Sequence, residues 1–279
     1  MRLANHDGRA VIITDDTTGF DVAAASADRF GPDIQGIYDD WDAFRAWADS
    51  ASGDAITIDP AKLGPVTPRP FQSFGVGLNY ADHVAESGMG TPDALPPVFA
   101  KFQSSIAGPY ETVELVPGGK TDWEAELVIV VSRKAHRVAE GTGWDYVAGL
   151  TVGQDLSERV TQLQPPSPQF GLGKSFPGYS PQGPWLVTPE ALPDRNDLAI
   201  TGELDGEVVQ SGHTGQMIFD VPSIIEKLSQ IVTLHPGDVI YSGTPSGVGF
   251  TREPEWLIQP GQTLTTTIEG IGTIRQTFV

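Results

Sequence analysis

Five apolar residues in a row, at positions 127–131, constrain the fold of this chain more than any other feature. Four of the five are β-branched, and a short apolar run of this kind predicts a buried β-strand. Glu124 and Glu126 stand at the head of the run. Because side chains alternate along a strand, we expect both carboxylates to point the same way. Two neighbouring carboxylates that lose hydration repel each other, which is costly unless a positive charge lies between them.

A hard divalent cation is the simplest source of that positive charge, since Mg²⁺ and similar ions bind carboxylate oxygens. The alternative is that Glu124 and Glu126 merely begin an edge strand in water. Asp155 is a candidate third ligand, because it stands where a second predicted strand, within residues 146–162, meets a loop. As a single aspartate it is equally compatible with a helix cap.

Composition favours a β-rich protein with many turns. The 279 residues include 32 Gly and 23 Pro, and the apolar runs are short. The chain has no Cys, which excludes disulfides and thiolate ligands. Its formal net charge of -19 argues against a nucleic-acid partner, whose phosphates it would repel. We find no apolar stretch long enough to span a bilayer and no apolar signal core, so we expect no membrane association and a cytoplasmic protein.

The chain divides into two predicted units, a small N-terminal domain at residues 1–66 and a catalytic domain at residues 67–279. Short strands are expected at 9–16 and 20–26, and an amphipathic helix at 39–50. Residues 62–70 contain three prolines, which disfavour helix and central strand and predict a linker.

His83 and Glu86 form a candidate general-base pair. The segment that follows Asn79, a good N-cap, predicts about two turns of helix that stop at Gly88. His83 and Glu86 are three residues apart and therefore share a face of that helix. A carboxylate beside an imidazole fixes its tautomer and raises its basicity. The alternative is an exposed helix pair of little consequence.

The Pro-, Gly- and Ser-rich segment 164–184 is predicted to be a long loop, and loops of this length are typically functional or disordered. It contains one lysine, Lys174. Three aromatic residues, Phe170, Phe176 and Tyr179, favour an ordered loop near a site. A solvated loop with an ordinary lysine is the alternative.

The rest of the chain predicts scaffold. Asp205-Gly206 lies between alternating segments and indicates a hairpin turn. Residues 219–234 predict a helix with Pro222 in its first turn, and Ile224, Leu228 and Ile231 are expected on the core face. Residues 263–278 predict a closing hairpin.

Seven blocks of this sequence resemble, in order, those of the fumarylacetoacetate hydrolase family, over about residues 70–279. The blocks are NYADHVAE (79–86), WEAEL (123–127), GQDLSER (153–159), GKSF (173–176), GQMIFDVPSIIEKLS (215–229), TLHPGDVI (233–240) and SGTPSGVG (242–249). The resemblance implies a mixed, mainly β fold: a core of rolled mixed β-sheets with a small α+β N-terminal domain. It also implies a homodimer and a Mg²⁺ or Mn²⁺ site, with Ca²⁺ as a further candidate ion.

The resemblance also implies roles for individual residues. The family's metal ligands fall on Glu124, Glu126 and Asp155. Its catalytic dyad falls on His83 and Glu86, and its active-site lysine on Lys174. Substrate-binding positions fall on Gln162 and Thr244, and Arg159 and Tyr80, within the matched blocks, are predicted to contact substrate too. The stretch 163–172, with its PPSPQ insertion, departs from the family pattern where the pocket is lined.

These residues predict a metal-dependent hydrolase that cleaves a C–C bond in a 1,3-diketone or an acylpyruvate-type 2,4-dioxo acid. His83, oriented by Glu86, would take a proton from water, and Lys174 would stabilise the developing oxyanion. The metal ion would supply the positive charge that a small anionic 2-oxo acid needs. Three alternatives stay open: an oxaloacetate-type decarboxylase, a hydratase, isomerase or lyase of a related 2-oxo acid, and a non-catalytic Ca²⁺-binding protein.

Overall fold

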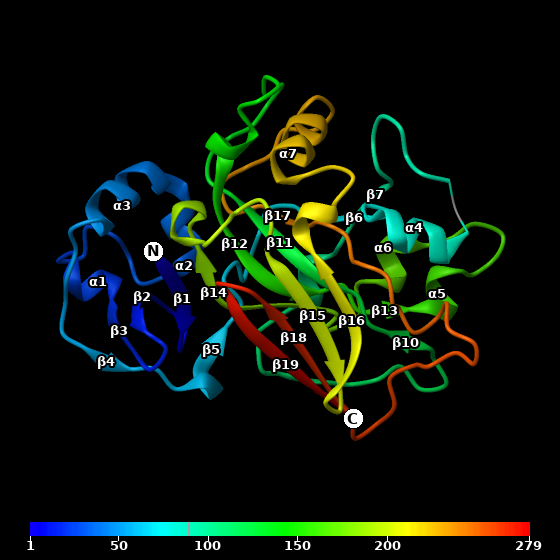
Figure 1. The fold of residues 1–279 in the computed structure, drawn as a ribbon. Coiled ribbons are helices and arrows are strands. Elements are labelled where there is room, and N and C mark those ends of the chain that lie inside the picture. The colour runs from blue at the N-terminus through cyan, green and yellow to red at the C-terminus, as the bar shows by residue number, and fades with distance from the viewer. Residues whose placement is uncertain (89) are drawn as a thin grey trace.

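The structure is a computed structural model that describes residues 1–88 and 90–279. A 12-stranded mixed sheet forms its centre (Figure 1). Ten strands follow one another in this sheet: β4 (Ile56–Thr57), β3 (Thr18–Asp21), β2 (Arg9–Asp15), β1 (Arg2–His6), β14 (Ser180–Val187), β12 (Val147–Gln154), β11 (Ala125–Val131), β17 (Val239–Tyr241), β6 (Ser73–Val76) and β7 (Val98–Ala100). Two short strands branch from this path, β5 (Leu63–Gly64) on β1 and β8 (Ile106–Ala107) on β14.

Two smaller sheets complete the β structure. The five-stranded sheet has the order β16 (Glu207–His213), β15 (Ala199–Leu204), β18 (Thr263–Ile268), β19 (Gly272–Phe278) and β9 (Thr112–Val113). A two-stranded sheet joins β10 (Thr121–Asp122) and β13 (Ser157–Glu158). The hairpin β15–β16 turns at Asp205-Gly206, and β18 and β19 form the C-terminal hairpin, both as predicted.

The described helices are short and lie around the sheets (Figure 1). The α-helices are α1 (Val22–Ala25), α2 (Ile34–Ile37), α3 (Trp41–Ala48), α4 (Ala81–Ser87), α5 (Arg159–Gln162), α6 (Phe170–Gly173) and α7 (Val221–Ser229). The 3₁₀ turns are η1 (Tyr38–Asp40), η2 (Pro60–Lys62), η3 (Gln103–Ser105), η4 (Gly143–Tyr146), η5 (Pro189–Ala191) and η6 (Thr214–Gln216). The predicted mainly β, mixed fold class is confirmed.

Strand β11 is the buried strand that the apolar run predicts. All seven of its residues are buried, and it pairs antiparallel with β12 on one side and with β17 on the other. Leu127 and Ile129 pack into one core cluster, whereas Val128 and Val130 belong to another. The alternation of side chains along the strand therefore places β11 between two hydrophobic cores.

The N-terminal strands continue the central sheet. Strand β1 pairs with β14, with Leu3 opposite Leu186. Leu3, Val128 and Leu186 belong to one core cluster, which also contains aromatic residues of α3. Residues from both sides of the expected boundary at 66/67 therefore share a sheet and a core. The division into two domains stays a prediction.

Two secondary-structure predictions near the N-terminal side are wrong. The strand expected at 20–26 ends at Asp21, because the Asp21 carboxylate accepts a hydrogen bond from Ala24 N at 2.9 Å and starts α1. Asn79 does not cap α4, which begins after Tyr80. The Asn79 side chain instead bridges two loops, with Nδ2 donating to the carbonyl oxygens of Phe219 (2.9 Å) and Ser242 (2.7 Å).

Two further predictions are corrected in the second half of the chain. Segment 164–184 is not one long loop, since it contains α6 and the start of β14. Strand β14 tolerates Pro184 because the ladder to β12 is irregular between Leu150 and Val152, opposite that part of β14. Ile231 is 68% exposed, since α7 ends at Ser229.

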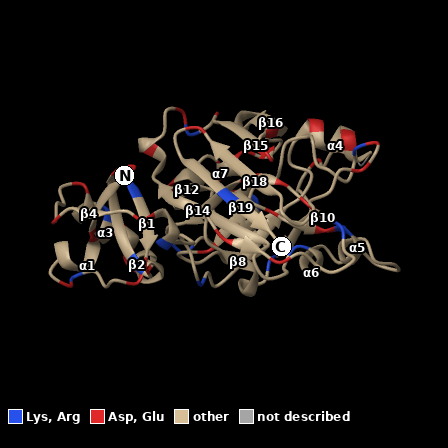
Figure 2. Cartoon of the chain, turned by 90° about the horizontal axis from the view of Figure 1, so that it is seen from below, with Lys and Arg blue, Asp and Glu red and all other residues tan. Residues whose placement is uncertain are grey.

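Acidic residues outnumber basic ones, 36 to 17, and Figure 2 shows them on many elements of the chain, α4 among them. Among residues 1–88 and 90–279, no helix has the length and apolar character needed to cross a membrane.

Candidate metal and active site

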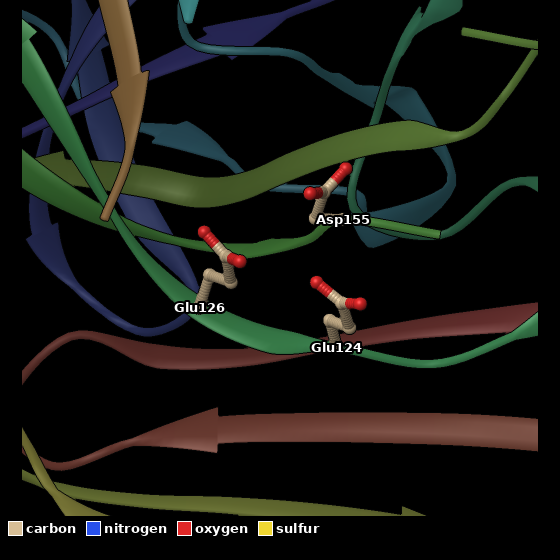
Figure 3. Close-up of side chains that lie close together, drawn as sticks. All are labelled: Glu124, Glu126 and Asp155. Carbon is tan, nitrogen blue, oxygen red and sulfur yellow. The ribbon is translucent and has the colours of Figure 1, made fainter. Parts of the chain in front are cut away.

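Three carboxylates meet where β11 begins and β12 ends (Figure 3). Glu124 precedes β11, Glu126 lies within it, and Asp155 follows β12. The pairing of Ala125 with Gln154 brings these segments together, and Asp155 N donates to Glu124 O at 2.9 Å. One oxygen from each carboxylate lies within 4.8 Å of the others, and all three residues are buried. The structure thus brings together the three acids that the sequence proposed as metal ligands.

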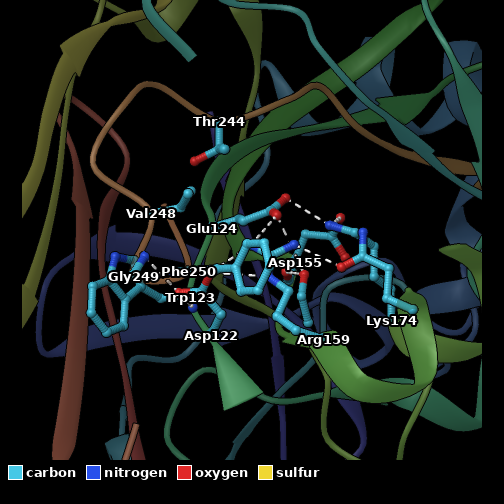
Figure 4. A network of polar contacts seen from close by, with 12 residues as sticks. Asp122, Trp123, Glu124, Asp155, Arg159, Lys174, Thr244, Val248, Gly249 and Phe250 are labelled. Atoms are coloured by element: carbon cyan, nitrogen blue, oxygen red, sulfur yellow. Dashed lines mark hydrogen bonds and ion pairs between the residues drawn. The ribbon is translucent and has the colours of Figure 1, made fainter. Parts of the chain in front are cut away.

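Two lysines and one arginine neutralise part of this negative charge (Figure 4). Lys174 Nζ lies 2.7 Å from Glu124 Oε2 and 2.6 Å from Asp155 Oδ2. Lys101 forms a buried ion pair with the other oxygen of Asp155, and Arg159 Nη2 lies 2.8 Å from Glu124 Oε1. Burial alone would raise the pKa of Glu124, but Lys174 and Arg159 hold it well below its usual value.

Glu126 differs from the other two acids because it belongs to none of the ion pairs found in the described part of the chain. It accepts a hydrogen bond from Gly243 N at 2.9 Å. Burial, and then the neighbouring Asp155 and Glu124, raise the pKa of Glu126 well above its usual value. A buried carboxylate that lacks a cation, beside two others, fits a hard divalent ion such as Mg²⁺ or Mn²⁺.

Asp122 ties the arginine to a loop that follows β17 (Figure 4). Its Oδ2 accepts hydrogen bonds from Arg159 Nη2 (2.6 Å) and Nε (3.0 Å). Its Oδ1 accepts from Gly249 N at 2.7 Å, and Oδ2 also accepts from Phe250 N at 3.1 Å. Asp122 therefore fixes both the guanidinium beside Glu124 and the backbone that carries Phe250.

His83 and Glu86 form the predicted pair on α4. His83 Nδ1 lies 2.7 Å from Glu86 Oε1, and both side chains are largely buried. Glu86 Oε2 accepts a second hydrogen bond, from Gly247 N at 2.9 Å. Burial alone would raise the pKa of Glu86, but the hydrogen bonds from His83 and Gly247 lower it overall. The ionised carboxylate holds His83 Nδ1 as a donor, which leaves Nε2 as the basic nitrogen.

A cavity of about 270 Å³ joins the dyad to the acidic site. His83 and Glu124 both line it. Its other polar side chains are those of Ser87, Arg159, Gln162, Lys174 and Thr251. Its apolar lining is larger and consists of Leu78, Pro97, Val98, Phe99, Leu163, Phe170, Val248 and Phe250. An imidazole, a carboxylate of the acidic site and two cations therefore line one cavity.

The structure separates the four residues proposed to bind substrate. Arg159 and Gln162 line the cavity, where Arg159 Nη1 donates to Gln162 Oε1 at 2.8 Å. Thr244 and Tyr80 are not among its lining residues. Thr244 is buried and donates from Oγ1 to Ala125 O at 2.9 Å, and Tyr80 is 1% exposed. The roles of all four stay predictions.

Sequence reasoning gave no role to Lys101 or Asp122, although both carried a signal. Lys101 stands alone in an apolar, small-residue stretch, and its Nζ also donates to the carbonyl oxygens of Lys174 (2.6 Å) and Tyr179 (3.4 Å). Asp122 precedes Glu124 by two residues, so the period-2 rule that selected Glu124 and Glu126 also includes it.

Comparisons with known proteins identify the family of this chain. The family model for the C-terminal domain of fumarylacetoacetate (FAA) hydrolase matches residues 72–279. The human mitochondrial oxaloacetate tautomerase FAHD2A is 43% identical over 213 residues, which cover 76% of this chain and 67% of that protein.

Solved structures share the fold over the whole chain. A Mycobacterium smegmatis protein assigned to HpcE has a TM-score of 0.93 and 50% identity, covering 100% of this chain and 99% of that chain. Maleylpyruvate hydrolase from Sphingobium sp. SYK-6, solved with manganese(II) and pyruvate, has a TM-score of 0.78 and 25% identity, with 100% and 99% covered. The family model spans most of this chain, and the fold of the chain matches that of these two solved structures. The chain belongs to the fumarylacetoacetate hydrolase family.

Proposed function

We propose that this protein is a divalent-metal-dependent hydrolase that cleaves the C–C bond of an acylpyruvate-type 2,4-dioxo acid or a related 1,3-diketone. One observation carries the proposal: His83, which contacts Glu86, lines the same cavity as Glu124 of the acidic site. A base within reach of a metal site is the arrangement that hydrolysis of such a substrate requires. The proposal includes a homodimer and a cytoplasmic location, as expected from the sequence.

Glu124, Glu126 and Asp155 are the residues that would hold Mg²⁺ or Mn²⁺. The ion, when bound, would supply Lewis-acid polarisation of the 2-oxo group and a counter-charge for the substrate carboxylate. A hard cation suits three buried carboxylates whose oxygens converge within 4.8 Å. Binding would also relieve the mutual repulsion that the Glu126 carboxylate experiences.

His83 acts as the general base. Glu86 accepts a hydrogen bond from Nδ1–H, so Nε2 is free to take a proton from water as the water oxygen attacks the distal carbonyl carbon (C4). The C3–C4 bond then breaks, and its electron pair passes to C3. His83 returns the proton to C3, and the products are a carboxylic acid and pyruvate. The acid keeps the oxygen that came from water.

Lys174 serves as a donor rather than a base. Burial alone would lower its pKa, but the carboxylates of Asp155 and Glu124 raise the pKa of Lys174 overall, so the side chain stays an ammonium. Lys174 lines the cavity, and its Nζ is held between two carboxylates at 2.6 and 2.7 Å. A fixed positive charge at this place stabilises the oxyanion that develops during the attack.

A keto–enol tautomerase of a 2-oxo acid is the second candidate. Proton transfer at C3 needs the base and the 2-oxo acid site but no attacking water, and the 43%-identical human relative is an oxaloacetate tautomerase. A decarboxylase would likewise need no water. A non-catalytic Ca²⁺-binding protein would need neither the dyad nor Lys174.

A panel of acylpyruvates and oxaloacetate, assayed with Mg²⁺, Mn²⁺ or Ca²⁺, tests the proposal. We expect pyruvate release, with one ¹⁸O from labelled water in the acid product. His83→Ala should lower the rate by roughly 10²–10⁴-fold and retain Mn²⁺ binding. His213→Ala, at an exposed histidine remote from the cavity lining, is the matched control.

Three results would contradict hydrolysis. Enol–keto exchange of oxaloacetate without pyruvate release from any acylpyruvate would favour the tautomerase. CO₂ release would favour the decarboxylase. Inactivity with every ion tested would favour the Ca²⁺-binding protein.

A further inference from the structure

The cavity is lined by polar and by apolar side chains. The polar residues used by the proposed reaction are His83, Glu124, Arg159, Gln162 and Lys174. We call five of the apolar side chains the collar, namely Phe99, Leu163, Phe170, Val248 and Phe250. The proposed reaction uses the polar residues only, so the collar has no part in the bond-breaking chemistry.

Three separate segments supply the rings of the collar. Phe99 lies in β7 and Phe170 in α6, and their ring centroids are 5.9 Å apart at an interplanar angle of 40°. Phe250 lies in the loop that Asp122 binds through hydrogen bonds to its backbone. Aromatic rings at this spacing form a surface that favours contact with another apolar or aromatic group.

Two rings of the collar also lie against the cations of the cavity. Lys174 Nζ lies 5.2 Å from the centroid of Phe99, and Arg159 Cζ lies 5.7 Å from the centroid of Phe250. At these distances the ring faces attract the cations, which gives each cation an aromatic neighbour in addition to its carboxylate partners.

Both side-chain cations of the cavity already have carboxylate partners. Lys174 contacts Glu124 and Asp155, and Arg159 contacts Asp122 and Glu124. The remaining Arg159 nitrogen, Nη1, donates to Gln162. Among the lining residues that the structure describes, no lysine or arginine is left to bind a second substrate carboxylate at the collar.

The charge of the buried site leads to the same conclusion. Leaving aside the partly exposed His83–Glu86 pair, four carboxylates and three cations are buried together, which leaves one negative charge when all are ionised. The carboxylates are Asp122, Glu124, Glu126 and Asp155, and the cations are Lys101, Arg159 and Lys174. A divalent ion at the acidic site would make the balance one positive, which the single carboxylate of a 2-oxo acid would neutralise. A second carboxylate would add an uncompensated charge to a buried volume, which is costly.

We propose that the collar selects substrates with an uncharged apolar acyl group, aromatic or branched aliphatic, and disfavours dicarboxylates. Phe99, Phe170 and Phe250 are the specificity-determining residues. The inference rests on the proposed function, because that function places a 2-oxo acid against the polar residues of the cavity. The selectivity of the collar is a separate prediction, which concerns only the tail of the bound 2-oxo acid.

Binding measurements test the collar without turnover. Three stable 2-oxo acids are titrated calorimetrically into the Mn²⁺-loaded protein: pyruvate, 2-oxo-4-phenylbutanoate and the dicarboxylate 2-oxoadipate. We expect 2-oxo-4-phenylbutanoate to bind about 10- to 100-fold more tightly than pyruvate, because its ring enters the collar. The dicarboxylate should bind more weakly than the phenyl compound by a similar factor. Equal affinities, or a preference for 2-oxoadipate, would overturn the inference.

Variants connect that preference to the collar. Phe170→Ala should remove most of the advantage of the phenyl compound, and its effect on the affinity for pyruvate should be much smaller than its effect on the affinity for the phenyl compound. Phe170→Arg, which places a cation in the collar, should shift the preference toward 2-oxoadipate. Phe102→Ala is the matched control, since Phe102 is 52% exposed and lies outside the cavity lining. If Phe170→Ala and Phe102→Ala behave alike, the collar does not select the tail.

A rate measurement separates this inference from the proposed function. The wild-type protein is assayed with benzoylpyruvate, acetylpyruvate and fumarylpyruvate, and we expect the highest kcat/KM for benzoylpyruvate. A higher kcat/KM for fumarylpyruvate would support the hydrolase activity and contradict the selectivity proposed for the collar. Tighter binding of the phenyl compound without cleavage of any of the three acylpyruvates would support the selectivity of the collar and contradict the hydrolase activity.

Discussion

Asp122 and Arg159 form a buried ion pair in which Nη2 and Nε of the arginine lie 2.6 Å and 3.0 Å from the same carboxylate oxygen. The same carboxylate accepts hydrogen bonds from Gly249 N and Phe250 N. Burial alone would lower the pKa of Arg159, but Asp122 and Glu124 raise it overall, so the arginine stays charged. One side chain thus holds in place the guanidinium beside Glu124 and the loop that bears Phe250.

Asp122→Asn should therefore destabilise the protein. Removing one charge from a buried pair leaves the other uncompensated, which costs about 3 kcal/mol or more. Thermal unfolding measures the loss. Lys120→Met is the control, because Lys120 pairs with Glu255 at the surface and should change stability by less than about 1 kcal/mol. Similar shifts in Tm for the two variants would contradict the importance of the buried pair.

Glu126→Gln and Glu124→Gln should have opposite effects on the metal-free protein. Glu126 is buried without a side-chain cation, so its neutral analogue should raise Tm in EDTA at pH 8, by roughly 2–4 °C for each kcal/mol gained. Glu124 pairs with Lys174 and Arg159, so its neutral analogue should lower Tm. Both variants should lose the rise in Tm that Mn²⁺ gives the wild type. A Mn²⁺-induced rise retained by both would refute the acidic site as a metal site.

Glu86→Gln should lower the rate of hydrolysis, because an amide holds His83 Nδ1–H less well than a carboxylate does. The loss should be no greater than the roughly 10²–10⁴-fold expected for removal of the base itself. Steady-state kinetics of Glu86→Gln, His83→Ala and the double variant measure it. The double variant should resemble His83→Ala, since Glu86 acts through His83. Losses that multiply would mean that the two residues act independently.

Glu158→Gln should show a pH-dependent loss of stability. Burial alone would raise the pKa of Glu158, but hydrogen bonds from Lys120 N and from Thr161 lower it overall. A carboxyl whose pKa is depressed on folding stabilises the protein above its unfolded value of about 4.3, and this stability is lost as pH falls through the folded value. The variant should be less stable at pH 7, by about 1 kcal/mol, and the difference should shrink below pH 4. Glu114→Gln, at an exposed glutamate, is the control, and a difference that is constant with pH would contradict the assignment.

The chain should unfold in one calorimetric transition, in spite of the division expected from its sequence. Strand β1 pairs with β14, and Tyr38 donates a hydrogen bond to Val66 O at 2.9 Å. Leu186 would lose buried contacts if residues 1–66 were removed. We therefore expect the fragment 67–279 to be insoluble or far less stable than the whole chain. A soluble fragment with a wild-type Tm and Mn²⁺ affinity would support two independent domains.

Local periodicity accounts for what the sequence predicted well. Strand β11 and the common direction of Glu124 and Glu126 follow from alternation along a strand, and the His83–Glu86 contact follows from spacing on a helix. These features depend on residues only two or three positions apart. The position of Asp155 at a strand end made it a candidate third ligand, and Lys174 stood alone in a loop; the resemblance to a known family assigned a role to each.

Contacts between distant segments account for the rest. Asp122 meets Arg159 37 positions later and Gly249 127 positions later, and no local rule links them. The sequence does not predict strand β14 because its prolines disfavour a central strand, whereas the irregular ladder to β12 accommodates Pro184. Asn79 was assigned to a cap because its side chain suits one, but two carbonyl groups from far along the chain bind it instead.

The position of Lys101 has an evolutionary consequence. The Lys101 ammonium binds Asp155 and the backbone carbonyl of Lys174. Lys174 is therefore held in place through its main chain by Lys101 and through its side chain by Asp155. Residues 163–172 precede Lys174 in the chain and include two residues of the cavity wall, Leu163 and Phe170. We therefore expect Lys174 to keep its place when residues 163–172 change, so that related chains could differ in this part of the cavity wall and still retain the acidic site.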